Sequence, residues 1–255
     1  MLILCLDCST QVAGVALVDE DRCYYEIMVN AGNKHSRTLL SLIDAGLKET
    51  GKKPEHLEAI AVTKGPGSFT GLRIGLATAK GLAMAWDKPL VGVPTLDVLA
   101  AGWGWMADLV CPVLNARKGE VYAAVYKTKN DEKGRLTEYM ALSPERVAIM
   151  CRELLLKEGG NSVALLGDGA LVAFSSFEKV LARKVVVPPY PDTWLRPSVL
   201  GREAIKLIKV EGYQEDVFEL VPLYVRPSEA EVKLGMVQGG FVDAGKNPQD
   251  AVQGP

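Results

Sequence analysis

The spacing of apolar residues predicts an order of strands and helices that runs twice along the chain. Three short apolar runs separated by polar breaks, LILCLDC, VAGVALVD and RCYYEIMVN, predict three consecutive strands in an antiparallel arrangement. An amphipathic helix is expected next, between a candidate N-cap at Ser36 and a stop at Gly51. Its apolar stripe consists of Leu39, Leu40, Ile43 and Leu47.

A strand, a crossover helix and a second strand are expected after this amphipathic helix. LEAIAVT predicts the first strand, TGLRIGLATAKGLAMAW predicts the helix, and PLVGV predicts the second strand. TLDVLAAGWGWM then predicts another helix, with Thr95 as its N-cap.

The same order of elements recurs in the second half of the chain. Three strands, LVCPVLNAR, EVYAAVYKT and RLTEYMAL, come first. A helix over about residues 145–157, the strand SVALLG, a helix after Gly167-Asp168-Gly169 and the strand KVVVP follow. This repetition predicts a duplicated α/β fold, although the halves share no visible sequence identity. We expect an N-terminal lobe over residues 1–107, a C-terminal lobe over 108–194, a helical segment over 195–228 that packs back on the first lobe, and a disordered tail over 235–255.

Composition narrows the possible classes of protein. The chain has 255 residues, of which 48% are hydrophobic and 24% charged, and no apolar run approaches the roughly 18 residues of a membrane span. Asp7 interrupts the apolar N-terminus and no basic leader precedes it, so we expect a cytoplasmic protein without membrane contact. Five scattered cysteines predict neither a disulfide framework nor a zinc site. A net charge of −2 indicates that any contact with RNA requires a partner.

The glycine-rich stretch KGPGSFTGLRIG, residues 64–75, matches neither the G-x-G-x-x-G nor the G-x-x-x-x-G-K-[ST] nucleotide fingerprint. The helix N-terminus after its turn can still bind an anion, or the stretch can simply join strand to helix. Gly71 and Gly75 each cost roughly 0.5–1 kcal/mol relative to alanine in a helix, so tertiary packing must offset them. We expect these glycines to form a flat face for close approach of another backbone, with Leu72 and Leu76 facing the sheet. That backbone belongs either to the same chain or to a second one.

Five motifs together are similar to the TsaB (YeaZ) family: LDCST, HSRTLL, KGPGSFTGLRIG, KPLVGVPTLDVLA and NARKGEVYAAVY. The similarity covers about residues 1–230. It implies an actin-like, sugar-kinase-like (ASKHA) fold with two lobes, each a mixed five-stranded sheet with helices. It also implies a non-catalytic subunit that binds and stabilises a TsaD-like transferase. With a TsaE-like ATPase, that transferase converts adenosine 37 of tRNAs reading ANN codons to threonylcarbamoyladenosine.

The resemblance implies that the two helices of the N-terminal lobe contact the partner. The same helices would pair with a second copy in a homodimer when the chain is alone, and tRNA would be bound indirectly, through the complex. Residues expected at this interface are Ser36, Leu39, Leu40, Ile43, Leu47, Thr70, Gly71, Arg73, Ile74, Gly75, Thr78 and Leu82. Core packing within the chain remains the alternative for these apolar stripes.

The sequence also bears on catalysis and metal binding. The transferase holds its metal with an H-x-x-x-H pair, and the equivalent positions here are Thr95 and Leu99, of which leucine cannot bind a metal. His35 and His56 are the only histidines of the chain. We therefore expect no metal site and no catalytic residue.

A vestigial nucleotide site is the remaining candidate for chemistry. The resemblance implies that Asp7, Ser9 and Thr10 in the first hairpin, with Gly167 and Gly169 in the second lobe, correspond to a phosphate and adenosine site. We expect no tightly bound cofactor, and ATP or ADP only within the complex. One alternative is an active ATP-dependent phosphotransferase or ATPase that uses these residues. Another is that Asp7 and Ser9 organise the hairpin through hydrogen bonds to the backbone.

Overall fold

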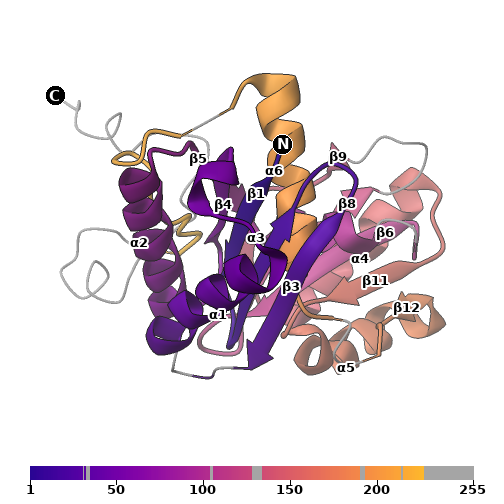
Figure 1. Ribbon diagram of the computed structural model, residues 1–255. Coiled ribbons are helices and arrows are strands. Elements are labelled where there is room, and N and C mark those ends of the chain that lie inside the picture. The colour runs from indigo at the N-terminus through magenta and orange to yellow at the C-terminus, as the bar shows by residue number, and fades with distance from the viewer. Residues whose placement is uncertain are drawn as a thin grey trace, which may run out of the picture.

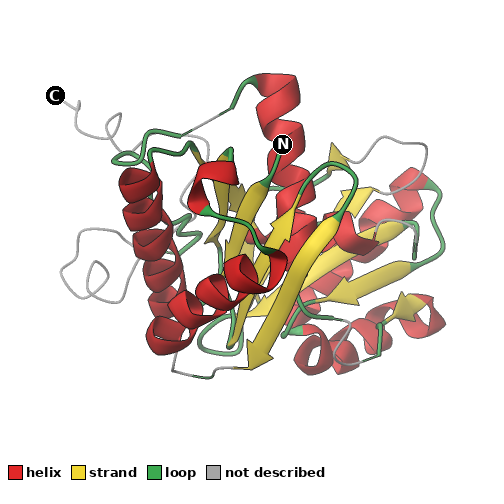
Figure 2. Cartoon of the chain, viewed as in Figure 1, coloured by secondary structure: helices red, strands yellow, loops and turns green. Residues whose placement is uncertain are grey.

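Two mixed β-sheets, each covered by helices, make up the two lobes of the molecule (Figures 1 and 2). The computed structural model describes residues 1–30, 32, 35–103, 106–127, 134–189, 193–213 and 215–226. The predicted tail over 235–255 lies outside the described residues, as do the last two residues of the 195–228 segment. None of the described helices combines the length and the apolar content that crossing a bilayer requires.

The N-terminal sheet has five strands in the order β3-β2-β1-β4-β5. β2 runs antiparallel to both β1 and β3, whereas β4 and β5 run parallel to β1. The crossover helix predicted between the last two strands accounts for this parallel pair. The strands are β1 (Ile3–Asp7), β2 (Val12–Val18), β3 (Cys23–Asn30), β4 (Ala59–Gly65) and β5 (Leu90–Pro94).

Alternate residues of the central strand β1 pack against helices on opposite faces of this sheet. Leu4 and Leu6 join the apolar cluster under α1 (His35–Thr50) and α2 (Phe69–Trp86). Ile3 and Cys5 join the cluster on the other face, formed with α3 (Thr95–Trp103) and α6 (Pro197–Glu211). Figure 1 shows α1 and α2 side by side on one face and α6 on the other. A short 3₁₀ helix, η1 (Pro54–His56), precedes β4.

The second sheet has seven strands, two more than expected. The segment EVYAAVYKT was predicted as one strand, but it divides into β7 (Val121–Ala123) and β8 (Tyr126–Lys127), which pair with different parts of β6 (Leu109–Asn115). The order is β10-β7-β6-β11-β12, with β8 and β9 attached to β6 as a hairpin. The other elements are β9 (Gly134–Arg135), β10 (Met140–Leu142), α4 (Pro144–Glu158), β11 (Val163–Leu166), α5 (Ala170–Leu181), η2 (Ala182–Lys184) and β12 (Val185–Val186).

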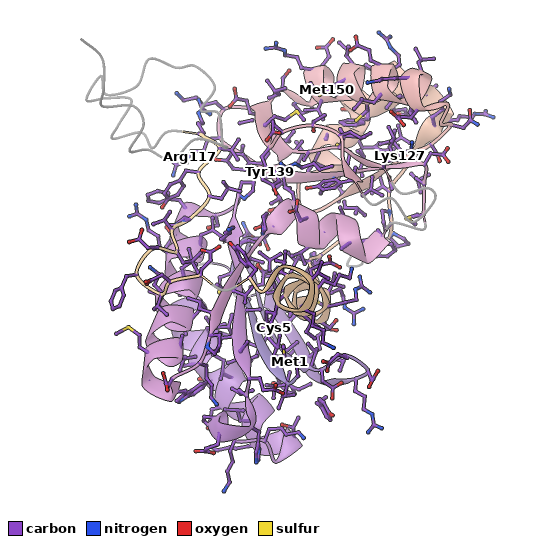
Figure 3. The ribbon with its side chains drawn as sticks, turned by 90° about the horizontal axis from the view of Figure 1, so that it is seen from above. Met1, Cys5, Arg117, Lys127, Tyr139 and Met150 are labelled. Carbon is purple, nitrogen blue, oxygen red and sulfur yellow. The ribbon has the colours of Figure 1, made fainter. Side chains whose placement is uncertain are left out.

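The lobes are joined by a polar contact between α3 and the β8–β9 region. Asp97 accepts hydrogen bonds from the hydroxyls of Tyr126 (2.5 Å) and Tyr139 (2.8 and 2.9 Å). Arg135 stacks 4.0 Å above the Tyr139 ring, and Figure 3 shows Tyr139 at the side of the second lobe that faces the first. A cavity of about 540 Å³ lies beside this contact. Burial and the neighbouring Asp97 raise the pKa of Tyr139, so its hydroxyl stays protonated and donates at neutral pH.

After α6 the chain returns across the first lobe as residues 215–226, which we call the C-terminal strap. Glu215 pairs with Leu90 of β5 through a backbone hydrogen bond of 2.9 Å, and its carboxylate binds the Lys64 ammonium at 2.6 Å. Further along, the Leu223 amide donates to the Lys64 carbonyl, and Arg226 pairs with Glu120 of the second lobe at 2.7 Å. The strap therefore covers the open edge of β5 and reaches both lobes.

Candidate functional site

The two glycines of α2 that were expected to meet a partner instead face the core of their own chain. A Cβ atom at Gly71 would lie 2.0 Å from the carbonyl oxygen of Cys8, and one at Gly75 would lie 3.4 Å from the Cys8 Cβ. The expected close approach of a backbone to α2 is confirmed, and that backbone is the end of β1 in the same chain. Gly71 and Gly75 are buried, so their prediction as partner-contacting residues is wrong. The buried stripe of α2 consists of Gly71, Leu72, Gly75, Leu76, Ala79 and Ala83.

The other residues predicted for the interface divide by burial. On α1, Leu39 and Ile43 are core residues, exposed by 0% and 3%, so they cannot contact a partner while the lobe is folded. Leu40 is 54% exposed. Thr70 and Arg73 are also exposed, whereas Leu47, Ile74, Thr78 and Leu82 are partly buried. The side chain of Ser36 lies outside the described part, although the helix itself begins at His35.

Exposed apolar side chains lie on α2 and the C-terminal strap, and others lie on α1, α4, α5 and α6. Phe218 and Val221 of the strap are 76% and 65% exposed, and Met84 of α2 is 59% exposed. The run VFELVPLY, apolar except for Glu219, indicates apolar residues in the strap, but their position against α2 depends on the fold. We call the exposed apolar residues of α2 and the strap the α2 face: Phe69, Met84, Phe218, Val221 and Tyr224.

Aromatic contacts connect the strap to the N-terminal end of α2. The Arg73 guanidinium stacks 3.8 Å above the Phe69 ring, and its Nε donates to the Tyr224 hydroxyl at 3.1 Å. The rings of Phe69 and Tyr224 lie 5.4 Å apart. Seven residues along the helix, Lys80 donates to the Phe218 carbonyl at 3.4 Å. The strap and α2 therefore form one continuous surface.

The glycine-rich turn before α2 packs directly on the first hairpin. The Ser68 amide donates to the Ser9 carbonyl at 2.7 Å, and a Cβ atom at Gly67 would lie 2.3 Å from that oxygen. Ser68 also caps α2, because its hydroxyl accepts from the Gly71 amide at 3.2 Å. The Ser68 and Gly71 amides thus have hydrogen-bond acceptors within the chain. This favours a structural role for the turn over a phosphate-binding site.

Asp7 is almost fully buried at the carboxyl end of β1. Its Oδ1 accepts from the Ser9 amide at 2.9 Å and from the Thr63 hydroxyl at 2.7 Å, so this carboxylate organises the hairpin and ties it to β4. The Thr10 hydroxyl accepts from the Val12 amide at 3.2 Å. Ser9 Oγ is buried without a hydrogen-bond partner among the described residues. Burial raises the pKa of the Cys8 thiol, which disfavours a reactive thiolate.

The turn over Gly167 to Gly169, which is the second-lobe part of the expected nucleotide site, is hydrogen-bonded to the end of β6. The Gly169 amide donates to the Val113 carbonyl at 3.1 Å, and the Asn115 amide donates to the Asp168 carboxylate at 2.9 Å. The two turns lie at the carboxyl ends of the parallel strands of their lobes, where open α/β sheets bind ligands. Their role as a nucleotide site stays a prediction.

The positions equivalent to a metal-binding histidine pair are part of the core. Thr95 and Leu99 of α3 are exposed by 0% and 2%. The Nδ1 atom of His56 accepts from the Lys53 amide at 3.0 Å, which closes the 3₁₀ turn η1. Within the described ranges, no three His, Cys, Asp or Glu side chains are grouped as a metal ion would require.

Two lobes with strands β3-β2-β1-β4-β5 and β10-β7-β6-β11-β12, in the same mixed arrangement, define an actin-like, sugar-kinase-like fold. A ROK hexokinase from Thermus thermophilus aligns with a TM-score of 0.50 at 13% identity, over 82% of this chain and all of the kinase, which supports the fold alone. YeaZ from Pseudomonas aeruginosa aligns with a TM-score of 0.71 at 26% identity, over 88% of this chain and 99% of its own.

Sequence comparison identifies the family within this class. The TsaB protein of Bacillus subtilis, named tRNA threonylcarbamoyladenosine biosynthesis protein, is 34% identical over 91% of this chain and 97% of its own length. The family model for TsaD, the tRNA N6-adenosine threonylcarbamoyltransferase, matches residues 29–178. A transferase of that name from Nitratidesulfovibrio vulgaris is 32% identical over 53% of this chain and 42% of its own length. The chain belongs to the TsaB family and shares the TsaD-type domain.

Proposed function

We propose that this chain is a non-catalytic subunit that binds and stabilises a TsaD-like transferase. The complex would modify adenosine 37 of tRNAs reading ANN codons to threonylcarbamoyladenosine. The family names support the pathway, since curated relatives are called biosynthesis proteins for this nucleoside. The observation that carries the subunit role is the α2 face, where large apolar side chains are exposed on a lobe that also resembles the transferase.

The α2 face has the chemistry of a protein interface. Aromatic and methionine side chains are enriched at such interfaces, and each apolar group removed from water contributes about 25 cal/mol per Å². Phe69, Met84, Phe218 and Tyr224 supply these residue types on one continuous surface. Arg73 lies among them, already stacked on an aromatic ring, so little side-chain entropy is lost when a partner covers it.

The hydrogen bonds of Asp7 support a subunit without its own catalytic centre. The Asp7 carboxylate, which an active phosphotransferase of this fold would direct at a metal or phosphate, accepts hydrogen bonds from Ser9 and Thr63 inside the lobe. In this proposal the chain holds no tightly bound cofactor. ATP or ADP is held only within the complex, where a TsaE-like ATPase joins the transferase in the cytoplasm. Without its partners, the chain pairs with a second copy through the same face.

The test is to combine the chain with the TsaD and TsaE homologues of its own organism. Met84→Glu should weaken complex formation by at least about tenfold, because a charge in an apolar interface must be desolvated. Leu156→Glu is the matched control, since Leu156 is 74% exposed on α4 of the other lobe. Size-exclusion chromatography measures the complex, and transfer to tRNA measures its activity.

Two results would contradict the proposal. Modification that proceeds equally well without this chain would exclude the subunit role, and equal binding by Met84→Glu and wild type would exclude the α2 face as the interface. Calorimetry of the isolated chain with Mg-ATP tests the phosphotransferase alternative. Micromolar binding together with turnover would favour that alternative.

A further inference from the structure

The hairpin that joins β6 to β7 carries two adjacent cations at its tip. Arg117 and Lys118 are both exposed, and the Glu120 amide closes the turn on the Arg117 carbonyl. Lys118 and Gly119 have φ values of +62° and +75°, which is the pattern of a type I′ turn. Glycine and asparagine are the favoured residues at the first of these positions, so the lysine is held there at a cost in backbone strain.

A third cation reaches the same hairpin from the far end of the described chain. Arg226 of the C-terminal strap pairs with Glu120, 106 residues earlier in the sequence. Tyr122 of β7 is partly buried two residues after Glu120. Burial raises the pKa of its hydroxyl, and the charges of Arg226 and Arg117 oppose this rise. Figure 3 shows Arg117 where the two lobes meet. We call Arg117, Lys118, Tyr122 and Arg226 the hairpin cluster.

The hairpin cluster adjoins the α2 face. Tyr224, which packs on Phe69 of α2, lies two residues before Arg226 in the strap. The cluster therefore lies beside the surface proposed to bind the partner. Arginine, lysine and tyrosine are the side chains that contact RNA phosphates and stack on bases.

Resting on the function proposed above, we propose that the hairpin cluster binds the phosphate backbone of the tRNA held by the partner. With a net charge of −2, this chain cannot attract RNA by its overall field, so a small set of cations beside the interface adds contacts to those of the transferase. The cluster carries no base-reading geometry, and its contribution is sequence-independent.

The test uses the complete complex with its TsaD-like and TsaE-like subunits. The double substitution Arg117→Glu with Lys118→Glu should weaken tRNA binding about tenfold. It should also lower the slope of log affinity against log salt by about 1.5, since each lost phosphate contact contributes roughly 0.7–0.9. The matched control is Arg183→Glu with Lys184→Glu, an exposed neighbouring pair on η2 with the same change of charge.

A second variant separates RNA binding from folding. Lys118→Gly should raise the denaturation midpoint, because glycine adopts the positive φ without strain, and should still weaken tRNA binding. An intact complex in which both hairpin variants keep wild-type affinity and salt slope overturns the inference alone. Loss of ATP hydrolysis with unchanged tRNA affinity also overturns it, since the bound phosphate would then belong to a nucleotide. If the wild-type chain forms no complex, the proposed function fails and the inference fails with it.

Discussion

Replacing the glycines of α2 one at a time by alanine tests how this helix packs. At Gly71 the new Cβ would lie 2.0 Å from the Cys8 carbonyl oxygen, far inside van der Waals contact. The backbone fixes the position of a Cβ, and the oxygen is itself a backbone atom, so no side-chain rotation relieves the clash. Overpacking of this kind costs roughly 1–3 kcal/mol or more, against a gain in helix propensity of about 0.5–1 kcal/mol. We expect Gly71→Ala to destabilise the chain by about 2 kcal/mol.

The same substitution should have different effects further along the helix. At Gly75 the new Cβ would make an ordinary 3.4 Å contact with the Cys8 Cβ, so helix propensity and close packing should leave stability nearly unchanged. At Gly81 nothing lies within 4 Å, and the alanine should stabilise by about 0.5–1 kcal/mol. The three variants differ only in what the methyl group meets.

Urea denaturation followed by circular dichroism measures the three midpoints at one pH and temperature. The expected order of stability is Gly81→Ala, then Gly75→Ala, then Gly71→Ala. A Gly71→Ala midpoint equal to or above that of Gly81→Ala would refute the packing of α2 against the end of β1. Gly71 would then lie on the partner-contacting face that the sequence predicts.

Two further predictions concern contacts that join separate elements. Burial would raise the pKa of Glu26, but the guanidinium of Arg196 and the hydrogen bonds from Ser198 lower this pKa below its usual value. The Glu26 carboxylate therefore stabilises the fold above the unfolded pKa of roughly 4.3. This stabilisation is lost as the pH falls through the folded pKa. Denaturation midpoints of wild type and Glu26→Gln should converge as the pH falls below about 4, and a constant difference down to pH 3 would contradict this. Tyr139→Phe removes hydrogen bonds to the Asp97 carboxylate between the lobes and should cost about 1.5–3 kcal/mol in urea denaturation, whereas an unchanged midpoint would mean that the lobes do not depend on this contact.

Local sequence patterns predicted most elements because the relevant interactions are local. The helix expected over about 145–157 is observed as α4 over Pro144–Glu158, with Ser143 as a cap whose hydroxyl accepts from the Arg146 amide. The three consecutive strands and the strand–helix–strand crossover of the first lobe are also confirmed. In each case apolar periodicity, capping residues and turn residues point to the same boundaries.

The orientation of α2 could not be read from periodicity. Its glycines and leucines occupy adjacent positions around the helix, and the sequence leaves open whether the glycines face the same chain or a second one. In the structure both sets are buried, because the Cys8 carbonyl, which is distant in sequence, lies so close to Gly71 that only a residue without a side chain fits there. The path of the strap could not be predicted either, because the backbone hydrogen bonds to Leu90 and Lys64 and the Lys64–Glu215 ion pair join residues that are distant in sequence.

The ion pair at Arg226 bears on how far the two lobes can move. Closing of two domains around a ligand requires connections that act as hinges. Here the chain passes between the lobes after α3 and again before α6, and the strap adds a third crossing that is anchored on Leu90 and Lys64 at one end and on Glu120 at the other. Opening the cleft would pull the strap against those anchors. The strap should therefore oppose separation of the lobes, so that a displacement of one lobe is passed to the other through the strap.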